Sequence, residues 1–151
     1  MPRIVLRTTV KATPERCFDL SRNVDLHLAS TGGGTRERVV AGVRSGSLEL
    51  GDEVTFEARR LGMRWRMTSA ITSFDRPHRF VDEMRKGPFS HWRHEHVFER
   101  LSDGTLMIDD VTYAPVLWPL SWPVDLLLVR WYMRRMLRTR NAYLKAVAES
   151  P

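Results

Sequence analysis

The sequence contains a single cysteine, Cys17, among its 151 residues, and no long uninterrupted apolar run. One cysteine excludes a disulfide within the chain and suits a reducing compartment, so we expect the protein in the cytoplasm. The opening residues MPRIVLRTTVK alternate in polarity and carry charges at positions 3, 7 and 11, so we expect no secretory signal peptide. The most apolar stretch, VLWPLSWPVDLLLV, is interrupted by Pro119, Pro123 and Asp125, which makes it unsuitable as a membrane span.

The sequence also lacks a zinc finger, an RNP-type motif and a glycine-rich phosphate loop, although its net charge is +6. A net positive charge permits binding to nucleic acid or anionic lipid, so the position of the basic residues decides whether such a partner is expected. Most basic residues alternate with apolar ones, and we expect no nucleic-acid partner. Two interpretations of the one basic cluster stay open: a solvated helix face, or a face that binds anions or touches a membrane at most transiently. The cluster comprises Arg130, Arg134, Arg135, Arg138 and Arg140.

What is present is a repeated alternation of apolar and polar residues, which predicts strands. In one such segment Val54, Phe56 and Ala58 share a face that is opposite to charged neighbours. Short turn sequences separate the segments at hairpin spacing, so we expect an antiparallel sheet of seven strands. The expected strands span residues 3–11, 35–42, 52–61, 63–75, 78–86, 87–100 and 105–115.

Three helices complete the pattern. Thr13 is a suitable N-cap and Pro14 suits the first helical position, so a short helix begins in ATPERCFDLSR, and NVDLHLAS forms a second. Near the C-terminus, apolar residues recur at spacings of three and four and predict a helix of roughly 25 residues, about 40 Å long. Its apolar side needs a partner, and the concave face of the sheet is available. The apolar positions are Leu126, Val129, Met133, Met136, Leu137, Leu144 and Val147.

This order of elements resembles the START-like (SRPBCC) superfamily of helix-grip proteins. The resemblance covers nearly the whole chain and includes TPERCFDLSRNVDLH, LGDEVTF, ITSFDRPHRFVDE, GPFSHWRHEHVFE and GTLMIDDVTY. It is nearest to the bacterial polyketide cyclase or dehydrase-like branch and to a similar domain fused to some sugar-nucleotide epimerase-like proteins. The resemblance implies an α+β helix-grip fold in one domain, residues 1–151, with the seven-stranded antiparallel sheet wrapped around the long C-terminal helix. It also implies an apolar ligand cavity, without implying one particular reaction, a metal or another cofactor.

Three of the five histidines lie in GPFSHWRHEHVFER. Alternation places His94 and His96 on the same face as Trp92 and Phe98, and this aromatic face is expected to point inward. His91 is out of this alternation and is expected at the edge of a loop. The apparent triplet is therefore an inward pair and one peripheral histidine.

The following strand supplies a carboxylate for this pair. If residues 101–104 form a four-residue hairpin loop, His96 lies opposite Asp109. An inward carboxylate needs a counter-charge or hydrogen bonds, and His96 can provide them across about 5 Å between Cβ atoms. A register shifted by one residue would instead pair His96 with Asp110 and point Ile108 and Thr112 inward. The preferred register points Met107, Asp109, Val111 and Tyr113 inward.

Three interpretations of His94, His96 and Asp109 stay open. They can form a structural pair that satisfies itself, or a polar anchor for a carbonyl or hydroxyl of an apolar ligand. They can also form a metal site, although the paired carboxylate explains the cluster without one and we predict no metal. Asp82, on the expected inner face of the preceding strand, is a weaker candidate for the same polar patch.

We therefore predict a module that binds a hydrophobic small molecule, such as a lipid, an isoprenoid or a polyketide-like compound. The alternative is a cyclase or dehydratase in which His96 acts as base and Asp109 orients it. A domain that acts through a protein partner is a third possibility, and the oligomeric state is open. Cys17 is expected to be a small buried hydrophobe, and Trp65, Trp118 and Trp122 to line the cavity or its mouth. The predicted ligand-binding residues are Trp92, His94, His96, Phe98, Met107, Asp109 and Tyr113.

Overall fold

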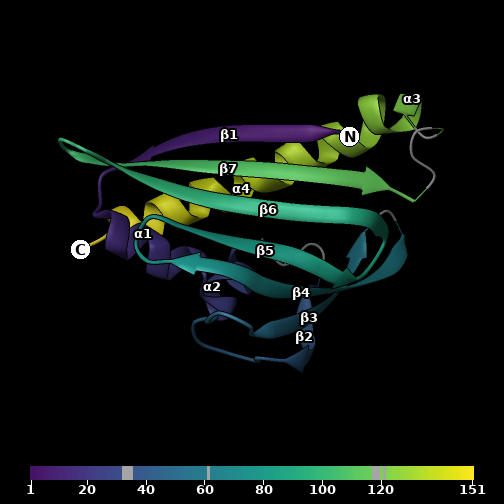
Figure 1. Cartoon of the computed structure of the whole chain (residues 1–151), viewed down its shortest axis with the longest axis horizontal. Helices are drawn as coiled ribbons and strands as arrows, with labels where there is room; N and C mark the ends of the chain where they lie inside the picture. Colours follow the sequence, from purple (N-terminus) through teal and green to yellow (C-terminus); the bar gives the residue numbers. More distant parts are fainter. Residues whose placement is uncertain (32–35, 61, 117–119, 121) are drawn as a thin grey trace.

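A computed structural model describes residues 1–31, 36–60, 62–116, 120 and 122–151 of the chain. Seven antiparallel strands form one sheet in the order β1-β7-β6-β5-β4-β3-β2, and the long C-terminal helix lies across it (Figure 1). The predicted α+β helix-grip architecture is confirmed. The strands are β1 (Arg3–Val10), β2 (Arg38–Gly42), β3 (Glu53–Arg60), β4 (Met63–Asp75), β5 (Arg79–Lys86), β6 (Phe89–Leu101) and β7 (Gly104–Pro115).

The two short helices lie where the sequence predicts them, and the predicted N-cap of the first is confirmed. In α1 (Pro14–Ser21) the Thr13 side chain accepts a hydrogen bond from a backbone N–H of the first turn, and Asn23 does the same for α2 (Val24–Ser30). The final helix comprises α3 (Trp122–Val124), a π-helical turn η1 (Asp125–Val129) and α4 (Arg130–Glu149). Among the described residues, no helix is long and apolar enough to span a membrane.

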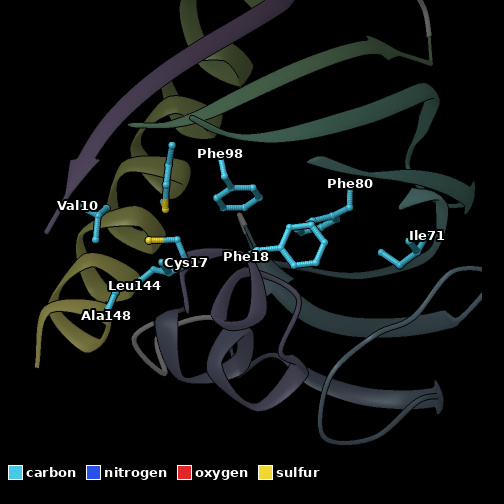
Figure 2. Packing of buried hydrophobic residues seen from close by; sticks show 9 residues of the cluster. Val10, Cys17, Phe18, Ile71, Phe80, Phe98, Leu144 and Ala148 are labelled. Carbon is cyan, nitrogen blue, oxygen red and sulfur yellow. The ribbon is translucent and has the colours of Figure 1, made fainter. Parts of the chain in front are cut away.

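Two groups of buried side chains hold the helices on the sheet. In the first group Phe18 of α1 packs edge-on against Phe80 and Phe98, with ring centroids 5.2 and 5.5 Å apart (Figure 2). Cys17 and Leu144 also belong to this group, and the expectation that Cys17 is a small buried hydrophobe is confirmed. The second group joins the start of α4 to the other end of the sheet and contains Ile4, Trp92, Val111, Tyr113, Met133 and Leu137.

The β6–β7 hairpin has the predicted register. His96 lies opposite Asp109, and Trp92 lies opposite Tyr113. The loop is shorter than expected, because Leu101 and Gly104 also pair and leave a turn of two residues instead of four. The register is unaffected, since extending both strands by one residue keeps every earlier pair in place.

Candidate functional site

A cavity of about 550 Å³ lies between the concave face of the sheet and the helices α2, η1 and α4. Because α4 packs along β1 and against α1 and α2, the inner faces of β3, β4 and β5 are left to line this space. Its volume is within the range of pockets that enclose small molecules. The walls are mainly apolar and include Val54, Phe56, Trp65, Met67, Ile71 and Met133.

Two histidines and a carboxylate interrupt this apolar wall on β5 and β6. The rings of His94 and His96 stack with centroids 3.8 Å apart, and Phe80 stacks on the other side of His96 at 4.2 Å. His96 Nε2 lies 2.9 Å from Asp82 Oδ2, and both side chains line the cavity. The polar patch therefore consists of Asp82, His94 and His96.

The hydrogen bonds of this patch cross the sheet register diagonally. Asp109 lies opposite His96 in the ladder, yet its Oδ1 is 2.8 Å from His94 Nε2. Asp82 lies opposite His94, yet it bonds to His96. The predicted His96–Asp109 pair is thus correct in register but not in its main hydrogen bond, since His96 Nδ1 is 3.3 Å from Asp109 Oδ1. Diagonal neighbours on one face remain within reach of long side chains, which permits this exchange of partners.

The positions of the two carboxylates determine where the protons reside. Burial lowers the pKa of His96, but hydrogen bonds to Asp109 and Asp82 outweigh this effect, and the pKa is raised. His96 therefore carries the charge between two carboxylates. Burial and the neighbouring His96 charge lower the pKa of His94, so its ring is neutral. With its Nε2–H donated to Asp109, His94 keeps a lone pair on Nδ1, and no described residue hydrogen-bonds to this atom.

Asp109 is the buried centre that orients both imidazoles. Its second oxygen accepts a hydrogen bond of 2.6 Å from Asn141 Nδ2 on α4, and Arg140 approaches its first oxygen at 3.4 Å. Burial raises the pKa of Asp109, but the hydrogen bonds from His94 and His96 outweigh it and hold the pKa well below its ordinary value. The carboxylate is ionised and acts by positioning the histidines.

The polar patch also presents the donor types of a metal site. Asp82, His94 and His96 each present one ligand atom within 4.8 Å of the others, so the set differs from the expected one, which contained Asp109. The two rings stack with a tilt of 29°, and the Nε2 atom of His96 is already 2.9 Å from Asp82 Oδ2. His94 could coordinate through Nδ1 while its Nε2 keeps the contact to Asp109, but His96 Nε2 would have to give up its proton and its hydrogen bond to Asp82. The side chains fit a hydrogen-bonded network better than a metal centre.

A second charged group lines the cavity near α2. Glu37 is buried and lies 3.0 Å from His27 Nε2 and 2.9 Å from Arg60 Nη2. Burial raises the pKa of Glu37, but His27 and Arg60 outweigh it, so the pKa is lowered. Arg60 also reaches the hydroxyl of Tyr132 on α4 at 3.5 Å. This group links α2, β3 and α4 across the cavity with its charges balanced internally.

With this geometry established, comparison with known proteins is informative. Residues 1–149 match the family described as "Polyketide cyclase / dehydrase and lipid transport". The chain belongs to this family. None of the curated proteins matches its sequence.

Solved structures share the fold of this family member at low sequence identity. Protein TTHA0849 from Thermus thermophilus is 19% identical with a TM-score of 0.76, over 96% of this chain and 95% of its own. Protein CV1439 from Chromobacterium violaceum is 16% identical with a TM-score of 0.72, over 100% of both chains. Ginseng major latex-like protein 151 from Panax ginseng is 12% identical with a TM-score of 0.68, over 99% of this chain and 98% of its own. At these identities the similarity shows the helix-grip fold.

Within this fold the seven predicted ligand-binding residues separate into three groups. Trp92, His94 and His96 line the cavity. Asp109 does not line the cavity but contacts residues that do, namely His94, His96 and Arg140. The remaining three do not line the cavity but pack in the protein interior: Phe98, Met107 and Tyr113.

The other expectations can be placed as well. Trp65 lines the cavity, Trp122 is 56% exposed on α3, and Trp118 lies outside the described residues. His91 belongs to β6, where a bulge between Phe89 and His91 shifts the pairing. The roles of all these residues in binding stay predictions.

Two residues of the network escaped the sequence pattern. Arg140, grouped with the basic face of the helix, has only 12% of its side chain exposed and lines the cavity beside Asp109. Asn141 occupies a buried position of α4, on the side where the pattern predicts only apolar residues. An isolated polar residue one helical turn before Leu144 was the available signal, because a buried amide requires a partner.

Proposed function

We propose that the protein binds a hydrophobic small molecule of the lipid, isoprenoid or polyketide type, and that the ligand carries a hydroxyl group. Membership of a family associated with cyclases, dehydrases and lipid transport supports the apolar ligand class. One observation carries the finer proposal: an apolar cavity of about 550 Å³ has a neutral, unpartnered imidazole nitrogen in its wall.

The chemistry of the patch favours a donor on the ligand. His94 Nδ1 accepts a hydrogen bond, and Asp82 beside it offers carboxylate oxygens, whereas the protons of His96 face the two aspartates. A ligand hydroxyl can donate to His94 Nδ1, which lies 3.8 Å from Asp82 Oδ2. A ligand carboxylate in the same place would be repelled by Asp82. Burying an apolar body around one satisfied hydroxyl combines affinity with orientation.

The proposal can be tested with 1-hydroxypyrene and 1-methoxypyrene, two fluorescent probes of similar size. We expect the hydroxyl probe to bind about fivefold to tenfold more tightly, because one hydrogen bond contributes about 1 kcal/mol. The His94→Phe variant should bind both probes equally, whereas the matched control His78→Phe, at an exposed turn, should keep the difference. Ala58→Phe places a large side chain in the cavity and should weaken the binding of both probes.

Two results would contradict the proposal. If neither probe nor any apolar compound in a cell extract binds the folded protein, the cavity is not a ligand site. If His94→Phe keeps the preference for the hydroxyl probe, the ligand is not recognised through His94.

The same geometry supports a second candidate, an enzyme of the cyclase or dehydratase type. A neutral imidazole with its Nε2–H held by a buried carboxylate is the arrangement of a general base and its orienting group. In this structure the base would be His94, not the predicted His96, since His96 is the charged member of the pair. A reactive poly-β-ketone probe would test this candidate. His94→Ala should abolish its conversion while the protein stays folded at the assay temperature, and full activity in His94→Ala would rule this role out.

A further inference from the structure

Large apolar side chains are exposed together at the start of the C-terminal helix. We call this group the apolar patch, and all its members are at least 43% exposed. Leu127 has 79% of its surface exposed and lies in the π-helical turn η1. Exposed apolar residues that are contiguous, not scattered, mark a surface that contacts something else. The apolar patch consists of Trp122, Val124, Leu126, Leu127, Leu128 and Trp131.

An uncompensated positive face continues the same side of the helix. Arg134, Arg135 and Arg138 are exposed, and none forms an ion pair with a described residue. No Asp or Glu occurs between Asp125 and Glu149 in the sequence. Leu127 and Arg134 are seven residues apart, which is two helical turns on one face and about 10 Å along the axis. The arginines therefore lie next to the apolar patch on the same side of the helix.

The opening of the cavity lies on this same helix. Most of the side chains that line the cavity are buried or half-buried. The exposed ones among the described residues are Leu128, Arg135 and Thr139, which all belong to η1 or α4. Leu128 is part of the apolar patch and Arg135 is part of the positive face. A surface that covers this side of the helix would therefore also cover the cavity mouth.

We propose that the apolar patch and the three arginines dock the protein onto an anionic phospholipid bilayer, with the cavity mouth against the membrane. The apolar side chains would enter the acyl boundary, while the arginines would lie at the phosphate level. Tryptophans at both ends of the patch suit this interface, and the Arg135 guanidinium lies over the Trp131 ring at 5.6 Å. Figure 1 shows α3 at the upper right, beside the N-terminus, where the start of this helix is not covered by the sheet.

The charge favours a bilayer over a second copy of this chain. A symmetric dimer through this face would place the same uncompensated arginines opposite one another, and like charges at a dry interface are costly. An anionic bilayer compensates them and accepts the apolar side chains at the same time. Bilayer docking rests partly on the proposed function, because an apolar ligand could then pass between membrane and cavity without crossing water.

Vesicle co-sedimentation tests the docking directly and without a ligand. We expect binding to vesicles of phosphatidylcholine and phosphatidylglycerol at 3:1, about tenfold weaker binding to phosphatidylcholine alone, and weakening by salt. Each basic side chain at an anionic surface raises the binding constant about fivefold. Arg134→Glu combined with Arg138→Glu should therefore lower the binding constant for the vesicles more than about twentyfold. Leu127→Asp should do the same by removing apolar contact.

Matched controls come from elsewhere on the surface. Leu50→Asp alters a leucine that is 61% exposed, and Arg7→Glu alters an exposed arginine of β1 without an ion pair among the described residues. Both should bind vesicles like the wild type. Absence of wild-type binding to the anionic vesicles, or equal losses in these controls, would overturn the proposal. A dimer that Leu127→Asp converts to a monomer would also overturn it, since a second copy would then cover the patch.

The same variants separate this proposal from the proposed function. Leu127→Asp should bind 1-hydroxypyrene in solution as the wild type does, because its side chain does not line the cavity. Probe binding without vesicle binding in the wild type would refute the docking alone. Vesicle binding without probe binding would refute the ligand proposal alone.

Discussion

Replacing Asp109 by asparagine is the most informative perturbation of the polar network. The carboxylate is 2% exposed and accepts hydrogen bonds from His94 and Asn141, while His96 lies 3.3 Å away. Asparagine keeps the shape but replaces one acceptor oxygen with an NH₂ donor. That donor would face another donor, either Asn141 Nδ2 or the Nε2–H of His94. The imidazolium of His96 would also lose one of its two carboxylates.

The expected cost follows from the burial of the group. Breaking a buried ion pair by removing one partner costs about 3–5 kcal/mol, because the remaining charge is left uncompensated. In a chain of this length about 1 kcal/mol shifts the melting temperature by about 2–4 °C. We therefore expect Asp109→Asn to lower the melting temperature by roughly 6–20 °C at pH 7. The neighbouring Asp110→Asn is the control, since Asp110 pairs with an exposed arginine and should cost less than about 1 kcal/mol.

The pH dependence provides a second readout. The folded-state pKa of Asp109 is lower than its unfolded value near 3.9, so its stabilisation is present above about pH 4 and is lost as the pH falls further. The charged or titratable groups that face it are His94, His96, Asp82 and Arg140. Thermal unfolding followed by circular dichroism should show that the melting temperature falls less at acidic pH in Asp109→Asn than in the wild type. A melting temperature within about 2 °C of the wild type, or an unchanged acid profile, would refute this reasoning.

Three further predictions concern stability, measured by chemical denaturation. Gly42→Ala should lower the free energy of unfolding by about 2 kcal/mol or more, because φ is +79° and the added Cβ would collide with a backbone carbonyl of β3. Gly46→Ala should lower it by about 1 kcal/mol, because φ is +80° but the added Cβ would meet open space. Leu144→Ala should cost about 2–5 kcal/mol in the core, and Leu127→Ala less than about 0.5 kcal/mol on the surface. Tyr113→Phe should change the free energy of unfolding by less than about 1 kcal/mol, because the buried hydroxyl forms no hydrogen bond with a described residue. Equal costs within either matched pair, or a loss above about 1 kcal/mol in Tyr113→Phe, would contradict the packing described above.

The fold was predictable because its signals are local and periodic. Alternation along β6 identified the inward face that holds His94 and His96, and the short turn before Gly104 fixed the register of β7. The cap at Thr13 placed the first short helix correctly, and the second lies within the predicted segment NVDLHLAS. Each of these features depends on residues a few positions apart, which is the range over which a pattern can be recognised.

The site was predictable only in part, because its partners are distant in the chain. Asp82 of the preceding strand meets His96, Asn141 of the final helix meets Asp109, and no spacing rule connects these pairs. The diagonal exchange of partners between the histidines and the aspartates depends on side-chain torsions that the register does not specify. Too many residues were predicted to line the cavity. The inward direction of a side chain does not distinguish a packed position such as Phe98 from one that faces the cavity such as Trp92.

The amino-acid sequence by itself determined the seven strands, the three helical segments, the β6–β7 register and the inward direction of the histidine pair. Those features follow from period-two and period-3.6 patterns and from capping residues, which act locally. Only the tertiary structure decided which imidazole carries the proton, because that depends on two carboxylates from different strands and on an amide from α4. It also decided that the exposed apolar turn of η1 lies beside the mouth of the cavity, since only the packing of the helix on the sheet brings the two together.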